Sequence, residues 1–360
     1  MHMAQFETLT VKDVIRETVD TVSVGFDVPE SLAQSFRFKQ GQYLTLRKEL
    51  KGEDTRRSYS ICSGVTESEL RVAIKQVDGG MFSTFANKDL KAGQELQVMP
   101  PMGNFTSELH PDNEKHYVLF AAGSGVTPMM SIVKSVLAIE PKSEVSLIYG
   151  NRYFKSIIFR DELEDLKDMN LGRLRIFHVL SGEMNEIDMF AGRINGEKTE
   201  KLFSTFLSPE RCDEVFICGP ETMINEVSSA CEKVGIAKDN IHFELFTSPK
   251  GSLEKAKNIE VADEHKGKTC HVDIILYGQQ WEFDMPFDKP ILDAAIDKGL
   301  DLPFSCKGGM CCTCRAKLEK GSVNMLVNYA LEPGEVDAGF VLTCQSIPTS
   351  DSVKVNFDQQ

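Results

Sequence analysis

Four cysteines crowd into one short stretch of this 360-residue chain, PFSCKGGMCCTCRAKLEKG, at residues 303–321. Cys306, Cys311 and Cys314 are separated by four and by two residues, and Cys344 follows after a gap of 29. Three thiolates from one loop and a fourth from a distant segment make the spacing typical of a 2Fe-2S cluster. The loop must therefore wrap around the cluster that it holds.

The neighbours of these cysteines agree with this interpretation. Gly308 and Gly309 suit such a loop, because backbone without side chains can approach the cluster and donate N–H bonds to its sulfurs. The alternative is structural zinc, which is usually held by paired short Cys spacings from both halves of a site. Here the second half is the single Cys344, so the spacing favours 2Fe-2S. Cys312 breaks the spacing from either side and is predicted to hold no metal.

Composition excludes several classes of protein. The net charge of −14 argues against a nucleic-acid partner. No apolar run approaches the ~20 residues of a membrane span, and the start lacks the basic and apolar regions of a secretory signal. The ten cysteines do not resemble a small secreted disulfide framework. We therefore expect a cytoplasmic protein, since clustered cysteines in that reducing compartment bind metal or do redox work.

Hydrophobic patterns divide the chain into segments. Residues 1–110 read as short strands with Gly and Pro turns, which predicts a small antiparallel β-barrel. Residues 111–248 alternate apolar strands with helical patterns, which predicts an α/β domain with a parallel sheet. Residues 249–263 are polar and weakly patterned, so we interpret them as a linker. Strands return in residues 264–360.

Two glycine turns follow strands of the second segment. In YVLFAAGSGVTPMM, Thr127 is expected to cap a helix and Pro128 to begin it. Backbone amides beside Gly123 and Gly125 then form an anion site suited to pyrophosphate. In VFICGPETM, the sequence CGP at 218–220 ends another strand. Ligands bind at the carboxyl ends of parallel strands, so each turn strengthens the other. The alternative for the first turn alone is a tight strand-to-helix turn, and the alternative for Cys218 alone is a buried core thiol.

Two motifs of the first segment also suit a nucleotide. In RRSYS, Arg57 and Tyr59 alternate along a strand and share one face, where they could clamp a phosphate and stack on a flat ring. In VDGGMFSTF, two glycines precede a helix start whose amides could hold a second pyrophosphate. The alternative for RRSYS is an ordinary exposed strand, and the alternative for VDGGMFSTF is a hairpin or a bulge.

Together these motifs give the chain a family resemblance. The order of barrel, nucleotide domain and cysteine cluster resembles the ferredoxin–NADP reductase family with a fused C-terminal plant-type ferredoxin. RRSYS matches the family pattern R-x-Y-S, PPMGNF matches P-x-G-x-F, and FELF matches the E-x-F that closes the flavin site. Within the family, RRSYSICS, VMPPMGNF and CKGGMCCTCRAKL are similar to the reductase subunits of phenylacetyl-CoA epoxidases, and next to those of ketosteroid hydroxylases and related oxygenases.

The resemblance implies an FAD-binding barrel, an NAD(P)-binding α/β domain and an α+β ferredoxin domain of the β-grasp type. Electrons would pass from NAD(P)H through FAD and the cluster to an oxygenase component. The implied catalytic residues are Ser60, Cys218, Glu244 and Phe246. The implied cofactor-binding residues are Arg57, Tyr59, Ser60, Ile74, Gly80, Met81, Phe82, Ser83, Gly123, Gly125, Thr127, Pro128, Arg152, Gly219, Pro220 and Met223. The implied cluster ligands are Cys306, Cys311, Cys314 and Cys344.

The stretch LIYGNRYFK bears on the choice of coenzyme. Enzymes that use NAD often place Asp or Glu at the end of this strand to bind the ribose hydroxyls. This chain has Asn151 and Arg152, with Lys155 close by. Arg152 can pair with a 2′-phosphate, which predicts a preference for NADPH over NADH. The alternative is a solvated surface arginine.

Two other functions stay open. One is a non-catalytic module whose flavin and cluster are only structural, although the intact nucleotide motifs speak against it. The other is an electron-transfer subunit of a flavin dehydrogenase complex, such as the dihydroorotate dehydrogenase type. Such subunits have a shorter gap before the last cysteine, so the gap of 29 residues disfavours that reading.

Overall fold

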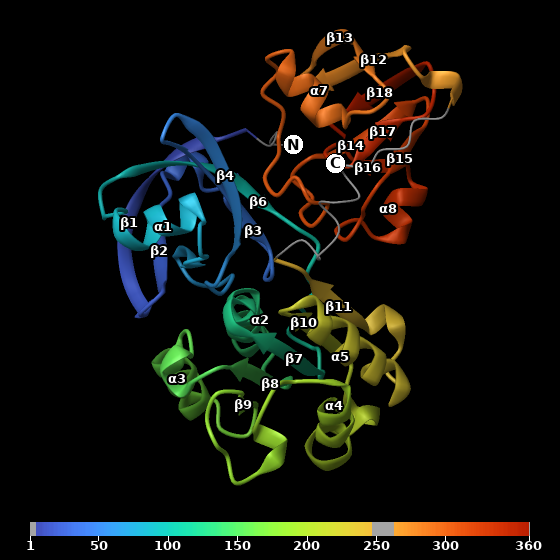
Figure 1. The fold of residues 1–360 in the computed structure, drawn as a ribbon. Helices are drawn as coiled ribbons and strands as arrows, with labels where there is room; N and C mark the ends of the chain where they lie inside the picture. Colours follow the sequence, from blue (N-terminus) through green and yellow to red (C-terminus); the bar gives the residue numbers. More distant parts are fainter. Residues whose placement is uncertain (1–4, 247–262, 360) are drawn as a thin grey trace. The chain divides into compact units, whose positions relative to one another are not determined.

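The computed structural model describes residues 5–246 and 263–359 (Figure 1). Residues 6–55 and 59–246 belong to one compact unit, and the described residues from 263 onward belong to a second. The predicted linker lies outside the described residues, except for its last residue, Asp263. Within the described ranges, no helix is long and apolar enough to cross a membrane.

The first unit begins with a six-stranded sheet in the order β4-β3-β6-β1-β2-β5. Its strands are β1 (Glu7–Thr18), β2 (Thr21–Asp27), β3 (Tyr43–Leu50), β4 (Glu53–Ser60), β5 (Leu70–Lys75) and β6 (Glu95–Met102). An antiparallel bridge from Ile61, just after β4, to Val72 in β5 joins the two ends of this order, so the sheet curls toward a barrel. Phe82 of helix α1 (Met81–Lys88) packs into the barrel core.

A five-stranded parallel sheet follows, in the order β11-β10-β7-β8-β9. Its strands are β7 (His116–Ala122), β8 (Glu144–Asn151), β9 (Leu174–Leu180), β10 (Glu214–Cys218) and β11 (Ile241–Glu244). Its helices are α2 (Val126–Ile139), α3 (Arg160–Met169), α4 (Gly196–Leu202) and α5 (Glu221–Lys233).

Alternation along β7 explains why helices cover both faces of this sheet, because successive side chains of a strand point to opposite faces. Leu119 joins the core that includes α2 and Leu163 of α3. Its neighbour Phe120 contacts Phe203, just after α4, with ring centroids 6.4 Å apart. The predicted helix-covered parallel sheet is confirmed.

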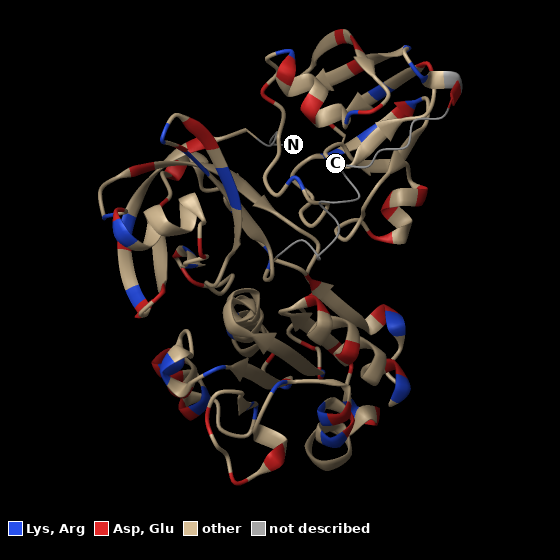
Figure 2. Ribbon diagram, viewed as in Figure 1, with Lys and Arg blue, Asp and Glu red and all other residues tan. Residues whose placement is uncertain are grey.

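The second unit contains a five-stranded mixed sheet in the order β13-β12-β18-β14-β16. Its strands are β12 (Thr269–Leu276), β13 (Gln279–Pro286), β14 (Arg315–Lys320), β16 (Phe340–Leu342) and β18 (Ser352–Asn356). A small second sheet pairs β15 (Val323–Met325) with β17 (Ser346–Pro348). Helices α7 (Ile291–Asp297) and α8 (Pro333–Asp337) complete the predicted β-grasp fold and carry acidic residues (Figure 2).

Candidate functional site

Three neighbouring strands bring the predicted nicotinamide residues to one edge of the parallel sheet. β10 lies between β7 and β11, so Cys218 pairs with Ala121 on one side and with Glu244 on the other. The carboxyl ends of parallel strands border the crevice in which open α/β sheets bind ligands. The structure therefore places Cys218 and Glu244 side by side where a dinucleotide is expected.

The two predicted glycine turns pack directly against each other. A Cβ on Gly125 would lie 2.1 Å from the carbonyl oxygen of Cys218, so only glycine fits there. A Cβ on Gly219 would lie 2.6 Å from Cε of Met223. Gly123 has a φ of +55°, in the left-handed region that favours glycine. The glycines thus let the ends of β7 and β10 meet, which brings two sets of backbone amides to one place.

The start of α2 differs from the prediction. A 3-10 turn, Gly123–Gly125, precedes the α-helix, which begins at Val126, so Pro128 is not the first helical residue. The hydroxyl of Thr127 donates to the carbonyl of Ser124 at 3.0 Å, and no side chain caps the helix. The predicted cap is therefore wrong, because the glycine turn is already wound before the α-helix begins. A cofactor role for Thr127 and Pro128 stays a prediction.

Tyr149 supports the first glycine turn, and the sequence reasoning missed it. Its hydroxyl donates to the carbonyl of Gly123 at 2.9 Å and accepts from the backbone N–H of Ile158 at 3.3 Å. The side chain is fully buried in β8, and burial raises the pKa of the phenol, so it remains a neutral donor. The available signal was weak: VSLIYG carries two hydroxyl side chains, Ser146 and Tyr149, among apolar residues.

Ser60 of β4 and Glu244 of β11 meet within the first unit. The hydroxyl of Ser60 donates to Oε2 of Glu244 at 3.3 Å. Burial raises the pKa of Glu244 to about 8, against the opposing effect of this hydrogen bond. At neutral pH the carboxyl is therefore mostly protonated and has a hydrogen to donate. Burial and the nearby Glu244 also raise the pKa of the Cys218 thiol, which stays protonated.

The start of α1 presents the predicted phosphate-binding backbone. Gly80 immediately precedes the helix, and the hydroxyl of Ser83 donates to its carbonyl at 3.3 Å. The same hydroxyl accepts from the N–H of Val77 at 3.1 Å, which folds the glycine segment against the helix. The first amides of a helix have no acceptor inside it and favour an anion. Met81, Phe82 and Ser83 carry those amides here.

Four other predicted residues differ in exposure. Tyr59 is partly exposed, and its ring centroid lies 5.7 Å from that of the buried Phe82. Arg57 is exposed, and Phe246 is 38% exposed. Ile74 lies fully buried in the barrel core, so its side chain reaches no ligand in this conformation. The cofactor and catalytic roles of these residues stay predictions.

Arg152 lies at the carboxyl end of β8, on the same edge of the sheet as the glycine turns. Its side chain is exposed, and Cζ lies 5.2 Å from the ring centroid of Tyr153. Nζ of Lys155 lies 5.8 Å from the same centroid. Two cations therefore share one aromatic ring at the position where the sequence predicts the 2′-phosphate.

The four predicted cluster ligands form two pairs in the second unit. The sulfur atoms of Cys306 and Cys311 lie 3.2 Å apart. Cys314 and Cys344 form the other pair, and their hydrogen bond raises the pKa of Cys314. Among the described residues, no three His, Cys, Asp or Glu side chains are placed to hold a single metal ion. A 2Fe-2S cluster is held by four thiolates, two on each iron, which two pairs of cysteines can supply.

The backbone around Cys306 also suits a cluster. The N–H of Gly308 donates to its sulfur at 3.3 Å. A hydrogen bond from Cys311 and backbone N–H groups, including those of Gly308 and Met310, lower the pKa of Cys306 to about 6. Gly309 has a φ of +74°, and a Cβ there would lie 2.9 Å from the carbonyl oxygen of Val327. The loop thus offers the glycine backbone and the donors that a sulfur cluster requires.

Cys312, the remaining cysteine of this loop, contacts the backbone of a later segment. Its sulfur donates to the carbonyl of Ala330 at 3.3 Å, and the side chain is buried in the core of the second unit. This geometry supports the prediction that it holds no metal.

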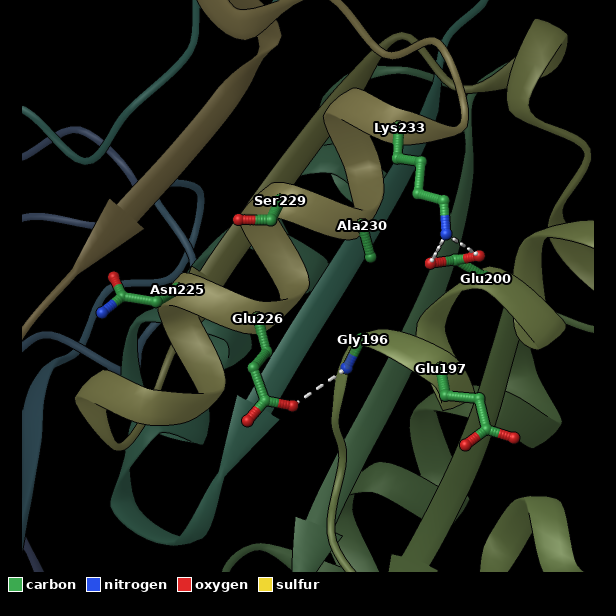
Figure 3. Close-up of a pocket in the computed structure, with 8 residues that line it drawn as sticks. All are labelled: Gly196, Glu197, Glu200, Asn225, Glu226, Ser229, Ala230 and Lys233. Atoms are coloured by element: carbon green, nitrogen blue, oxygen red, sulfur yellow. Dashed lines mark hydrogen bonds and ion pairs between the residues drawn. The ribbon is translucent and has the colours of Figure 1, made fainter.

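A groove of 570 Å³ lies between α4 and α5 (Figure 3). Three of its charged groups have partners within the groove: Lys233 pairs with Glu200 at 2.7 Å, and Glu226 accepts from the N–H of Gly196 at 3.2 Å. The groove contains none of the predicted site residues. Its lining residues are Gly196, Glu197, Glu200, Asn225, Glu226, Ser229, Ala230 and Lys233.

Three family models match the chain in the same order as the fold. They are an oxidoreductase FAD-binding domain over residues 8–107, an oxidoreductase NAD-binding domain over 119–229 and a 2Fe-2S iron-sulfur cluster binding domain over 268–349. The chain is 40% identical to one of the subunits of the 1,2-phenylacetyl-CoA epoxidase of Escherichia coli strain K12, over 99% of each chain. The protein belongs to the ferredoxin–NADP reductase family. It carries the fused 2Fe-2S domain of that family's oxygenase reductases.

Other relatives place this reductase in the same group. It is 33% identical to the ferredoxin reductase component of 3-ketosteroid-9-alpha-monooxygenase from Rhodococcus rhodochrous, over 99% of this chain and 98% of the relative. The solved structure of phthalate dioxygenase reductase matches 98% of both chains with a TM-score of 0.59 and 22% identity, a likeness of fold. The protein is thus an NAD(P)H-dependent oxidoreductase that uses FAD and a 2Fe-2S cluster.

Proposed function

We propose that this reductase supplies electrons from NADPH to the oxygenase component of a phenylacetyl-CoA epoxidase. The observation that carries this proposal is the 40% identity to the Escherichia coli epoxidase protein over the whole chain. The matches to ketosteroid monooxygenase reductases, at 33–35% identity, support a second candidate of the same class.

The site geometry supports hydride transfer at the edge of the parallel sheet. When bound, FAD takes a hydride from the nicotinamide and passes its electrons on singly. In this proposal the backbone at Gly123, Gly125 and Gly219 holds the dinucleotide, and Cys218 lies beside the nicotinamide. Glu244, protonated at neutral pH and bonded to Ser60, supplies a neutral hydrogen-bond donor at the same place.

Other residues of the chain would hold the FAD phosphates, the flavin ring, the 2′-phosphate of the coenzyme and the cluster. The start of α1 binds the FAD phosphates by its amides, Arg57 pairs with the pyrophosphate, and Tyr59 packs on the flavin ring. Arg152 pairs with the 2′-phosphate of NADPH, and Cys306, Cys311, Cys314 and Cys344 hold the cluster. A cytoplasmic location is part of the proposal, supported by the clustered cysteines, which in a reducing compartment bind metal or do redox work.

Reconstitution with purified oxygenase components tests the proposal. The reductase, NADPH, O₂ and the oxygenase component of phenylacetyl-CoA epoxidase should consume phenylacetyl-CoA, O₂ and NADPH in equal amounts, with one oxygen atom entering the epoxide and the other leaving as water. A parallel reaction contains the oxygenase component of a ketosteroid monooxygenase and its steroid. Faster turnover in the steroid reaction would contradict the proposed partner and favour the second candidate. No turnover in either reaction would contradict both.

A further inference from the structure

The loop that follows Cys306 contains one strained peptide. Lys307 has a φ of +51°, in the left-handed region that residues other than glycine seldom adopt. The N–H of the next residue, Gly308, donates to the sulfur of Cys306 at 3.3 Å. The carbonyl of Lys307 accepts from Nε2 of Gln345 at 2.9 Å. In a planar trans peptide the C=O and N–H bonds point in opposite directions, so a bond that fixes one end also fixes the other.

Gln345 is built into the protein interior at this point. Its side chain is only 3% exposed, and Nε2 also donates to the carbonyl of Cys344 at 3.0 Å. Both partners are carbonyl oxygens, so the amide must turn its NH₂ end toward them. Gln345 therefore connects the loop that carries Cys306 to the segment that carries Cys344. Cys344 is a member of the second pair of thiols.

Neighbouring backbone holds Gln345 itself in place. Its N–H donates to the carbonyl of Leu342, and its carbonyl accepts from the N–H of Leu326, both at 2.9 Å. A Cβ on Gly309 would lie 3.3 Å from Cγ of Gln345, so the stem of the side chain packs directly beneath the loop. A side chain fixed at its backbone, stem and amide has little freedom to release the Lys307 carbonyl.

We propose that Gln345 is a positioning residue that raises the reduction potential of the 2Fe-2S cluster by holding the Gly308 N–H against the sulfur of Cys306. Hydrogen bonds to the sulfurs help set the potential of such clusters, since they stabilise the more negative reduced form. A hydrogen bond to the carbonyl end of a peptide also polarises its N–H end. This inference rests on the proposed function, in which the four cysteines are the ligands and the cluster lies on the electron path.

The test compares full-length holoprotein with Gln345→Met, which keeps the length of the side chain and removes its donors. The matched control is Gln280→Met, since Gln280 is an exposed residue of the same unit that donates to Asp273 at 2.9 Å. We expect iron and acid-labile sulfide to stay at wild-type levels in both variants. In Gln345→Met the midpoint potential of the cluster should become more negative, so that the reduced fraction at a fixed solution potential falls several-fold. The electron paramagnetic resonance of the reduced cluster should change as well.

An unchanged potential in a fully loaded Gln345→Met protein would overturn the inference. So would an equal shift in Gln280→Met, because that would show a general effect of the substitution. Wild-type protein without iron and sulfide would instead contradict the proposed ligands, which separates the two failures.

A second background keeps the test decisive if Gln345→Met fails to retain its cluster. Glycine adopts a left-handed φ without strain, so Lys307→Gly should make the loop less dependent on the glutamine. The double variant Lys307→Gly/Gln345→Met should then recover the cluster, with a midpoint potential more negative than that of Lys307→Gly alone. Failure to recover the cluster, or a potential equal to that of Lys307→Gly, would overturn the inference.

Discussion

The hydroxyl of Ser60 lies 3.3 Å from Oε2 of Glu244, a contact that joins the last residue of barrel strand β4 to the last residue of sheet strand β11. Because burial raises the pKa of Glu244 to about 8, the pair is neutral below that pH and negatively charged above it. The contact is therefore a pH-sensitive feature at the proposed point of hydride transfer.

The first prediction concerns Glu244→Gln. In the wild type, flavin reduction by NADPH should slow as the pH rises through about 8, because the carboxyl loses the hydrogen that it donates. The glutamine side chain keeps the shape and a donor, so the variant should lose this pH dependence. Anaerobic stopped-flow bleaching of the flavin between about pH 6 and pH 10 measures both profiles. Identical profiles in the two proteins would count against the role of Glu244.

The same pKa predicts an effect on stability. Glu244 has a raised pKa in the folded protein, so the unfolded chain releases the proton first and the fold loses stability as pH rises from 4.5 toward about 8. Glu244→Gln should therefore gain stability relative to the wild type when the pH is increased across this window. Thermal unfolding at both ends of the window measures the gain, and its absence would contradict the raised pKa.

The second prediction concerns coenzyme choice. Arg152→Ala should reduce kcat/KM for NADPH by about ten- to a hundredfold and leave that for NADH nearly unchanged, since a charge-assisted hydrogen bond to phosphate contributes about 1.5–3 kcal/mol. The matched control is Arg211→Ala, because Arg211 is an exposed arginine that pairs with Glu144 at the opposite end of β8. If Arg152→Ala keeps the wild-type preference for NADPH over NADH, Arg152 does not bind the 2′-phosphate and is only a surface residue.

The third prediction concerns Tyr149→Phe, which removes the hydrogen bond to the carbonyl of Gly123 and the one from the N–H of Ile158. The KM for NADPH should rise about fivefold with kcat nearly unchanged, since a buried hydrogen bond contributes about 1 kcal/mol. Tyr117→Phe is the control, because this fully buried tyrosine lies on the adjacent strand β7 and bonds to Glu140 instead. The control should lose stability without a change in KM. A matching rise in KM in the control would show that any buried hydroxyl has this effect.

The fourth prediction separates the cysteines. Serine at Cys306, Cys311, Cys314 or Cys344 should abolish or strongly lower the content of iron and acid-labile sulfide. Cys312→Ser should keep wild-type content, because the Cys312 sulfur donates to the carbonyl of Ala330 and its position breaks the ligand spacing. Loss of the cluster in Cys312→Ser together with its retention in Cys311→Ser would shift the ligand register and contradict the assignment.

Patterns with a strong local cause were readable from the sequence. The spacing of the four cysteines predicted ligands that the structure arranges as pairs, and the alternation of strands and helices predicted the parallel sheet that brings Cys218 to Glu244. The cap of α2 was predicted wrongly, because local preference for Thr127 cannot reveal the 3-10 turn that the packing of Gly125 on Cys218 imposes.

The supporting residues could not be read from the sequence. Tyr149 and Gln345 act through hydrogen bonds to backbone carbonyls that are distant along the chain. No spacing rule marks such contacts, since they depend on how separate segments pack. Ser60 and Glu244 were assigned singly from the family resemblance, but the bond between them became visible only when the barrel and the sheet were both in place.

The central claim is that electrons leave the flavin through the cluster, and a cut at residue 255 tests it most directly. The cut falls in the predicted linker, and the unit that precedes it has hydrophobic cores of its own. Fragment 1–255 should bind FAD and reduce ferricyanide with NADPH at nearly the rate of the intact chain. It should not support electron transfer to the oxygenase. Fragment 256–360 added in trans should restore this transfer only weakly, because separate chains lack the effective concentration, of order mM, that fusion supplies. Full support of the oxygenase by fragment 1–255 alone would show that the cluster is not on the electron path and would contradict the account.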